Sequence, residues 1–437
     1  MSLQKTNQMY QRGAKVIPYG VNSNFRYWGP DETLVIPKSK GSHIWDVDGN
    51  RYIDYRLAFG PIILGHGYDA VTERVSEAIK DGTLFAWTTP MEIRVAERIT
   101  RMCKIDKVRL TNTGSEATMH ALRLARAYTN REKFIKFEGQ YHGQVDYFMF
   151  STASSSINQL GSPRSPVSAV TTSGIPRDIV KYVINLPFND LERLEETIEA
   201  RWHEIAAVFV EPLLGNAAGI MPKPEFLAKL RELTAKYGIV LVFDEVKTGF
   251  RIAKGGAQEY FGIQADLVTY AKSMGNGFPI AAFGGKEDIM MTLQPGKVSH
   301  GGTYSGNVAG AAAADATLEL IETQPILETI AERGQKLKDG LGQILTDAGI
   351  PHAMLGHPAI FGMILGVDTP PTDFRGYLDG DAALYEAIIT ELIKLGAQPD
   401  SDGREPWFMC YSHSEQDVAD TLTMFEQAVK TVLDGKK

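Results

Sequence analysis

IVLVFDE (239–245) and DLVTYAK (266–272) decide the fold of this chain, because each is a short apolar run that ends in charged side chains. An almost continuous apolar run is typical of a parallel strand that is buried on both faces of a sheet. Alternation of such strands with amphipathic helices predicts an open, mostly parallel α/β sheet with helices on both faces. Further strands are expected at 108–112, 133–139 and 205–212, and helices at 70–80, 92–103, 115–129 and 224–238.

The pattern changes at both ends of this α/β region. Residues 1–66 carry short β-like pieces, among them a hairpin at 43–55, and form a separate N-terminal segment. The large α/β domain covers 67–310, and an α+β C-terminal domain covers 311–437. In this last part we expect a long helical region at 311–348, a strand at 359–367 and helices at 381–395 and 415–433.

Composition excludes several classes of protein. The 437 residues carry 45 Lys and Arg against 53 Asp and Glu, a net charge of −8, so a nucleic-acid partner is not expected. A membrane partner is not expected either, because no apolar run reaches about 18 residues. Two cysteines and the absence of a signal-like start favour the cytoplasm. No HExxH or paired Cys/His spacing predicts a metal site, and no GxSxG elbow predicts a serine hydrolase.

One long polar stretch, 151–176, interrupts the α/β pattern. It is rich in Ser, Thr, Gly and Pro, and a loop of this length in a compact domain is usually functional or disordered. We interpret it as a mobile flap over a cleft, with a plain surface excursion as the alternative.

Polar side chains at the strand ends predict the chemistry, since ligands bind beyond the carboxyl ends of strands in open α/β sheets. Lys272 ends one strand, and burial there would lower its pKa and make it a nucleophile. Asp244 ends another and needs a cationic partner, for which the ring nitrogen of pyridoxal 5′-phosphate (PLP) is suitable. A surface lysine and a structural carboxylate are the alternatives.

A phosphate cradle is predicted where strand 108–112 meets the following helix. Gly114 allows close approach, and free backbone N–H groups with the Ser115 hydroxyl can bind phosphate, although Ser115 can also simply cap the helix. Tyr141, beside His142, can stack on a flat ring or pack in the core. The turn 301–307 can add phosphate contacts or only start a helix. Together these features describe one phosphorylated aromatic aldehyde.

The spacing of LVFDEV, DLVTYAKSMGNG and GGTYSGN resembles that of the class III, fold-type I PLP-dependent aminotransferases, over about residues 14–435. The resemblance implies a mostly parallel sheet plus a small lobe built from N- and C-terminal segments, and a homodimer with active sites at the interface. It also implies roles toward the cofactor: Lys272 bonds the aldehyde, Asp244 pairs with the ring nitrogen, and Gly114 and Ser115 bind the phosphate. Tyr141 and His142 would contact the ring, and Asn216 would lie near the ring 3-oxygen with Glu211 supporting it. Thr303 would reach the phosphate of the neighbouring subunit's cofactor.

Within the class, YGVNSNFR (19–26) and KFIKFEGQYHG (133–143) are most similar to glutamate-1-semialdehyde 2,1-aminomutases. Arg26 then corresponds to the arginine that binds the substrate carboxylate, with Ser23 nearby. Phe59 stands where a tryptophan is usual, and Glu405 corresponds to a glutamate at the entrance. Lys247, in DEVKTGFR (244–251), stands where these aminomutases have an apolar residue, as in DEVMTGFR. These departures concern the substrate wall rather than the cofactor set.

The predicted function is PLP-dependent transfer of an amino group on a small amino/oxo carboxylate, with pyridoxamine 5′-phosphate as the second cofactor form. The resemblance favours conversion of glutamate-1-semialdehyde to 5-aminolevulinate. The alternative is a class III transaminase that acts on a β-amino acid or another amino carboxylate, with a separate keto-acid acceptor. A non-enzymatic PLP-fold protein is disfavoured, because Lys272 and Asp244 are both present.

Overall fold

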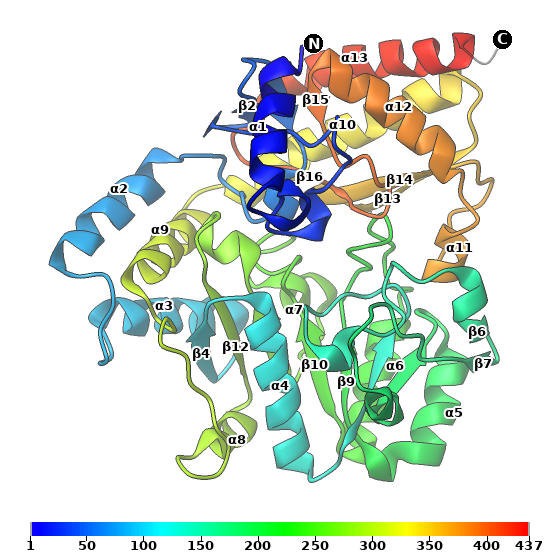
Figure 1. The fold of residues 1–437 in the computed structure, drawn as a ribbon. Coiled ribbons are helices and arrows are strands. Elements are labelled where there is room, and N and C mark those ends of the chain that lie inside the picture. The colour runs from blue at the N-terminus through cyan, green and yellow to red at the C-terminus, as the bar shows by residue number, and fades with distance from the viewer. Residues whose placement is uncertain (1, 436–437) are drawn as a thin grey trace.

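A seven-stranded sheet forms the centre of the chain in a computed structural model that describes residues 2–435 (Figure 1). β12 pairs antiparallel with both of its neighbours, and the other pairs are parallel. The predicted mostly parallel α/β fold is therefore confirmed. The strand order is β4 (Lys107–Thr111), β12 (Ala281–Gly285), β11 (Leu267–Tyr270), β10 (Val240–Asp244), β9 (Ile205–Val210), β5 (Lys133–Phe137) and β8 (Val183–Leu186).

Helices cover both faces of this sheet, and the strand residues alternate between them. Val240 and Val242 of β10 belong to the apolar cluster that contains residues of α4 (Gly114–Thr129). Leu241 and Phe243 belong instead to the cluster that contains residues of α6 (Phe226–Tyr237). Every residue of β10 is thus buried, as the apolar run predicted. The remaining helices of this domain are α2 (Asp69–Ala78), α3 (Pro90–Cys103), α5 (Leu191–Arg201), α7 (Gly256–Phe261) and α8 (Glu287–Met290).

Segments from both ends of the chain build a smaller lobe, shown at the top of Figure 1. Its first sheet joins β3 (Arg51–Asp54) to β15 (Ala397–Gln398) in parallel, so the two ends share one sheet as predicted. The other elements of the lobe are β1 (Lys38–Lys40), β2 (His43–Trp45), β13 (His352–His357), β14 (Ile360–Leu365), β16 (Trp407–Phe408), α10 (Ile326–Asp347), α11 (Phe374–Tyr377), α12 (Ala382–Leu395) and α13 (Glu415–Asp434).

Two local expectations were incomplete. The N-terminal segment holds a helix, α1 (Gln4–Ala14), that the β-like pattern did not predict. Asp48, in the hairpin turn, accepts hydrogen bonds from the Lys5 and Thr6 backbone N–H groups and so satisfies the free donors at the start of α1. The helical region expected at 311–348 is two helices, α9 (Val308–Thr323) and α10, because Pro325 interrupts the helix.

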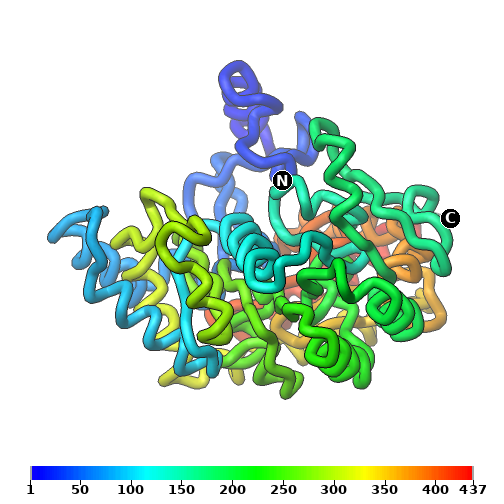
Figure 2. The backbone as a smooth tube through the Cα atoms, turned by 90° about the horizontal axis from the view of Figure 1, so that it is seen from below, coloured from blue at the N-terminus to red at the C-terminus, as the bar shows by residue number. Residues whose placement is uncertain are grey.

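The 151–176 flap is fastened to the body by two arginines. Arg375 forms a bidentate ion pair with Glu138, at 2.7 and 2.8 Å, and donates to the Gly161 carbonyl at 2.7 Å. Arg404 donates to the Ala153 carbonyl at 2.8 Å. In the view from below, the flap region and the dark-blue N-terminal segment project on the same side of the molecule (Figure 2). Flap mobility itself stays a prediction.

No helix within residues 2–435 combines the length and apolar character that a membrane span requires.

We predict that Arg375→Ala frees the flap, because Glu138 is 1% exposed and its buried carboxylate then loses its partner. Breaking one half of a buried pair costs about 3–5 kcal/mol, and urea unfolding measures this loss. Limited proteolysis should show new cleavage within 151–176. The exposed Arg177→Ala serves as the matched control. Unchanged stability and cleavage in Arg375→Ala would refute the anchoring role.

Candidate active site

The carboxyl ends of the strands meet at one cavity of about 190 Å³. Because β4, β5, β9, β10 and β11 run parallel, the loops that follow them lie along the same edge of the sheet. Most of the residues predicted for cofactor binding line this cavity. They are Gly114, Ser115, Tyr141, His142, Glu211, Asp244 and Lys272, joined by Thr118, Gly143, Val246, Lys247 and Ala271.

Lys272 provides the amine of the site. It follows β11 with a φ of 47°, a left-handed conformation that turns the chain sharply at the end of the strand. Its Nζ donates to the Phe59 carbonyl at 2.9 Å and forms no ion pair within residues 2–435. Desolvation, followed by the nearby charge of Lys247, lowers the pKa of Lys272 to about 7. A large fraction of the amine is therefore uncharged and nucleophilic near neutral pH.

Asp244 provides a buried carboxylate in the same cavity. It is 3% exposed, and its only ion-pair partner in the described chain is His142, at 2.7 Å from Nδ1 to Oδ2. The Thr269 hydroxyl and the Val246 backbone N–H donate to Oδ1, each at 3.1 Å. Burial lowers the pKa of His142, so this ring is neutral and donates through Nδ1. The carboxylate thus faces the cavity without a full positive charge to balance it.

Glu245, next to Asp244, has a structural role. Its carboxylate accepts hydrogen bonds from the Ala257 and Gln258 backbone N–H groups at the start of α7, and from the Thr248 hydroxyl. Burial raises the pKa of Glu245 to about 7.

The start of α4, where a phosphate cradle is predicted, lines the cavity through Gly114 and Ser115. Thr113, not Ser115, caps the helix through a reciprocal pair with Glu116, so the alternative role for Ser115 as the cap is wrong. The Ser115 Oγ instead accepts from the Gln144 backbone N–H at 3.0 Å and lines the cavity. A Cβ atom at Gly143 would lie 2.5 Å from that oxygen, so only glycine fits here. Free N–H groups, a hydroxyl and a helix N-terminus suit a phosphate.

Aromatic rings border the cavity. Tyr141 follows β5, and its backbone N–H donates to Glu211 at 2.6 Å. The Phe25 ring meets the Tyr141 ring edge-on at 6.0 Å and the Phe59 ring at 6.1 Å. Phe59 lies in a run of left-handed residues, 57–60, that brings its carbonyl to Lys272. The Phe59 carbonyl is therefore beside the Lys272 amine, and the role of Phe59 as a substrate-wall residue stays a prediction.

Glu211 supports a loop rather than Asn216 itself. Its carboxylate accepts from Tyr141 and from the Gly215 backbone N–H, at 2.6 and 3.1 Å, and burial raises the pKa of Glu211 to about 7. The Asn216 side chain is instead bound by Lys247, whose Nζ lies 2.8 Å from Asn216 Oδ1 and 2.8 Å from Glu405 Oε2. Sequence reasoning noted Lys247 only as a departure and missed this contact.

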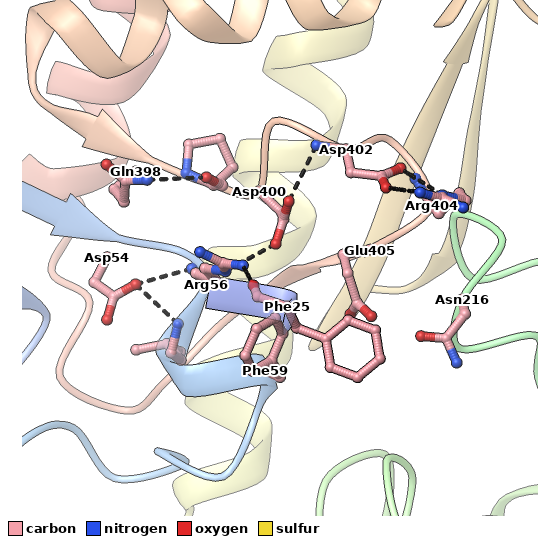
Figure 3. A network of polar contacts seen from close by, with 12 residues as sticks. Phe25, Asp54, Arg56, Phe59, Asn216, Gln398, Asp400, Asp402, Arg404 and Glu405 are labelled. Atoms are coloured by element: carbon pink, nitrogen blue, oxygen red, sulfur yellow. Dashed lines mark hydrogen bonds and ion pairs between the residues drawn. The ribbon is translucent and has the colours of Figure 1, made fainter. Parts of the chain in front are cut away.

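A second arginine, Arg56, lies beside Phe59 and was also missed. Its guanidinium stacks between the Trp28 and Phe59 rings, at 4.4 and 4.5 Å, and its Nε pairs with Asp400 at 2.8 Å. Figure 3 shows Arg56 beside Phe25 and Phe59, with Glu405 and Asn216 further along the same wall. The available signal was its position two residues after β3 in YIDYRLAFG.

Six predicted residues are not part of the cavity lining: Ser23, Arg26, Phe59, Asn216, Thr303 and Glu405. Arg26 and Thr303 are exposed, and Ser23 is half-buried. Arg26 follows Phe25 in the turn Asn24–Arg26, so it is adjacent in sequence to the aromatic wall formed by the Phe25, Phe59 and Tyr141 rings. Thr303 does not line the cavity of its own chain, and its role toward a neighbouring subunit's site stays a prediction.

Comparison with known proteins identifies the family. The family description "Aminotransferase class-III" matches residues 27–406. The chain belongs to the class III aminotransferase family. It is a PLP-dependent enzyme that transfers an amino group.

Individual relatives cover almost the whole chain. It is 40% identical over 427 residues to a glutamate-1-semialdehyde 2,1-aminomutase from Methanopyrus kandleri, covering 97% of this chain and 96% of the relative. Among solved structures, an omega-transaminase from Sphaerobacter thermophilus aligns with a TM-score of 0.90, 30% identity and 97% coverage of both chains. A β-phenylalanine aminotransferase from Variovorax paradoxus aligns with a TM-score of 0.85, 27% identity and coverage of 98% of this chain and 94% of that chain.

The residues present fit PLP. Lys272 offers an uncharged amine to an aldehyde, Asp244 offers a buried negative charge to a ring nitrogen, and Ser115 with the start of α4 offers donors to a phosphate. The His142 Nδ1 contacts the Asp244 carboxylate, so His142 would act on the cofactor through Asp244.

We predict that Lys272 is the most reactive accessible lysine of the cofactor-free chain near neutral pH, since Lys136, whose pKa burial also lowers to about 7, is 0% exposed. Its pKa of about 7 means that labelling by an acylating reagent should reach half its maximum near pH 7. Surface lysines should reach theirs near pH 10. Competitive labelling followed by mass spectrometry measures both. A half-point for Lys272 equal to that of the surface lysines would contradict the desolvated site.

Proposed function

We propose that this chain binds PLP between Lys272 and Asp244 and uses it to move an amino group within a small amino/oxo carboxylate. The observation that carries this proposal is the pairing of two unbalanced groups in one cavity. Among residues 2–435, Lys272 Nζ has only a carbonyl partner, and Asp244 has only a neutral histidine and two neutral donors. A ligand with an aldehyde at one end of its ring and a protonated nitrogen at the other complements both groups.

The chain's own groups then have distinct tasks. Bound PLP supplies an aldehyde that bonds amines and a ring that withdraws electrons. Lys272 Nζ supplies the lone pair that bonds the aldehyde and, once released, can accept and return a proton at the substrate carbon. Asp244 stabilises positive charge at the ring nitrogen, and the His142 Nδ1–H keeps the carboxylate in place. The flap and the aromatic wall exclude water.

The favoured substrate is glutamate-1-semialdehyde, converted to 5-aminolevulinate. Support comes from the 40% identity to the aminomutase of Methanopyrus kandleri over nearly the full chain. The reaction needs a molecule that carries both the amino and oxo groups and stays in place between the two halves of the cycle. The two arginine anchors of the flap, at Gly161 and Ala153, suit this retention.

Transamination with a separate keto-acid acceptor is the second candidate. The specific observation in its favour is the Lys247–Glu405 ion pair, which makes the substrate wall charged where an apolar residue is expected. The similarity to an omega-transaminase structure at 30% identity and to a β-phenylalanine aminotransferase at 27% agrees with such a substrate.

A homodimer is part of the proposal. Trp87 is 84% exposed and Tyr304, next to Thr303, is 64% exposed, and apolar side chains of this size on a surface favour a protein partner. A second copy that covers this face would place Thr303 toward the partner's phosphate site. We also propose a cytoplasmic location, since Cys103 and Cys410 are both free and buried.

We predict that the pyridoxamine form of the enzyme converts glutamate-1-semialdehyde to 5-aminolevulinate with no other amino donor. The product is measured directly, and Lys272→Ala is the inactive control. If no 5-aminolevulinate forms while a separate keto acid is aminated, the enzyme is a transaminase and the favoured substrate is wrong.

We predict that Arg26→Ala lowers kcat/KM for carboxylate-bearing substrates by about 10- to 100-fold, the effect of losing a charge-assisted hydrogen bond. Simple amines should be affected far less, because they lack the group that the guanidinium binds. Arg12→Ala, in the neighbouring helix α1, is the matched control. An equal loss for both substrate classes would remove Arg26 from carboxylate recognition.

A further inference from the structure

Lys247 is a buried cation whose three donors are all in use. It lies three residues after Asp244, is 8% exposed and lines the same cavity as Lys272. Its Nζ contacts the Gly215 carbonyl at 2.5 Å, Asn216 Oδ1 at 2.8 Å and Glu405 Oε2 at 2.8 Å. An ammonium group has three protons, so these three acceptors fix its position.

This contact decides how the Asn216 carboxamide is oriented. The amide oxygen faces the ammonium of Lys247, because the flipped orientation would place two N–H donors against a cation. The Nδ2 group therefore points away from Lys247, and it is buried without a partner among residues 2–435. Figure 3 shows the Asn216 nitrogen directed away from Glu405. A buried donor left unpaired is unfavourable, and an acceptor on a bound ligand would supply the missing hydrogen bond.

Lys247 also connects this amide to the entrance and to the reactive amine. Its ion pair with Glu405 joins the loop after β10 to the segment that precedes β16, so these two segments are held together. Its charge is the second cause of the lowered pKa of Lys272, after desolvation, whereas the Glu405 charge acts in the opposite direction. The charge of Arg251 also lowers the pKa of Lys272, and the charge of Glu211 raises it.

We propose that Lys247 is a positioning residue: its ammonium holds the Asn216 amide with Nδ2 ready to donate to an oxygen of the bound cofactor, and it holds Glu405 at the entrance. The ring 3-oxygen is the acceptor that this arrangement suits. The inference rests on the proposed PLP site. It adds a charged residue that an apolar side chain could not replace.

The test uses the full chain with Lys247→Met, Asn216→Asp and a control, Lys254→Met. The control removes a half-buried lysine seven residues further along the chain that contacts the Glu322 carbonyl. Two quantities are measured: the dissociation constant for PLP, by titration of cofactor-free protein, and the labelling half-point of Lys272. Lys247→Met should weaken PLP binding about tenfold or more and raise the half-point by about one pH unit, because a neighbouring cation is lost.

The other variants separate orientation from charge. Asn216→Asp keeps an oxygen against Lys247 but has no Nδ2 donor, so PLP binding should weaken as in Lys247→Met. Lys247→Arg retains the charge, so its Lys272 half-point should stay close to that of the wild type. Lys254→Met should change neither quantity.

Two results would overturn the inference. In one, Lys247→Met folds, as judged by circular dichroism, yet leaves both quantities unchanged, which makes Lys247 only an anchor of the Gly215 loop. In the other, Asn216→Asp binds PLP as tightly as the wild type, a result that holds even if Lys247→Met fails to fold. A wild-type chain that does not bind PLP at all would overturn the proposed function instead, and this inference with it.

Discussion

A buried carboxylate and a buried amine that do not contact each other define the active site of this molecule. In the part of the chain that the structure describes, the Asp244 carboxylate is buried with only neutral donors, and the Lys272 amine is enclosed with only a carbonyl partner. Each arrangement is unfavourable in isolation, because a buried charge is stabilised chiefly by an opposite charge. The strand order of the sheet places both groups at one edge, in one cavity. A ligand that carries complementary groups at its two ends is what this arrangement can bind.

The surrounding structure keeps these two groups in place. β10 and β11 are paired in register, so Thr269 lies opposite Asp244 and donates to it. His142 contributes a second donor from the loop after β5. Arg251, fully buried behind the site, binds the Met409 and Ala359 carbonyls at 3.0 and 3.3 Å and so ties the small lobe to the cavity floor. The reactive edge is therefore supported from both lobes.

Much of this organisation could be predicted from the sequence, and the exceptions have physical reasons. Strands β9 and β10 are recognisable because burial on both faces demands continuous apolar runs. β12 was missed because its residues, AAFGG, lack the β-branched side chains that usually mark strands. Seven of the nine residues predicted for cofactor binding meet at the cavity because each lies at or just after a strand end, whereas Asn216 and Thr303 do not line it. The roles of Lys247 and Arg56 could not, since their partners Glu405 and Asp400 lie more than a hundred residues away in sequence.

The central claim is that Lys272 is the residue that bonds the PLP aldehyde, and reductive trapping tests it most directly. The purified chain is incubated with PLP, reduced with borohydride, digested and examined by mass spectrometry. The account predicts one stoichiometric phosphopyridoxyl adduct on the peptide that contains Lys272, and none there in Lys272→Ala. An adduct on another lysine, or scattered substoichiometric labelling with Lys272 unmodified, would contradict it.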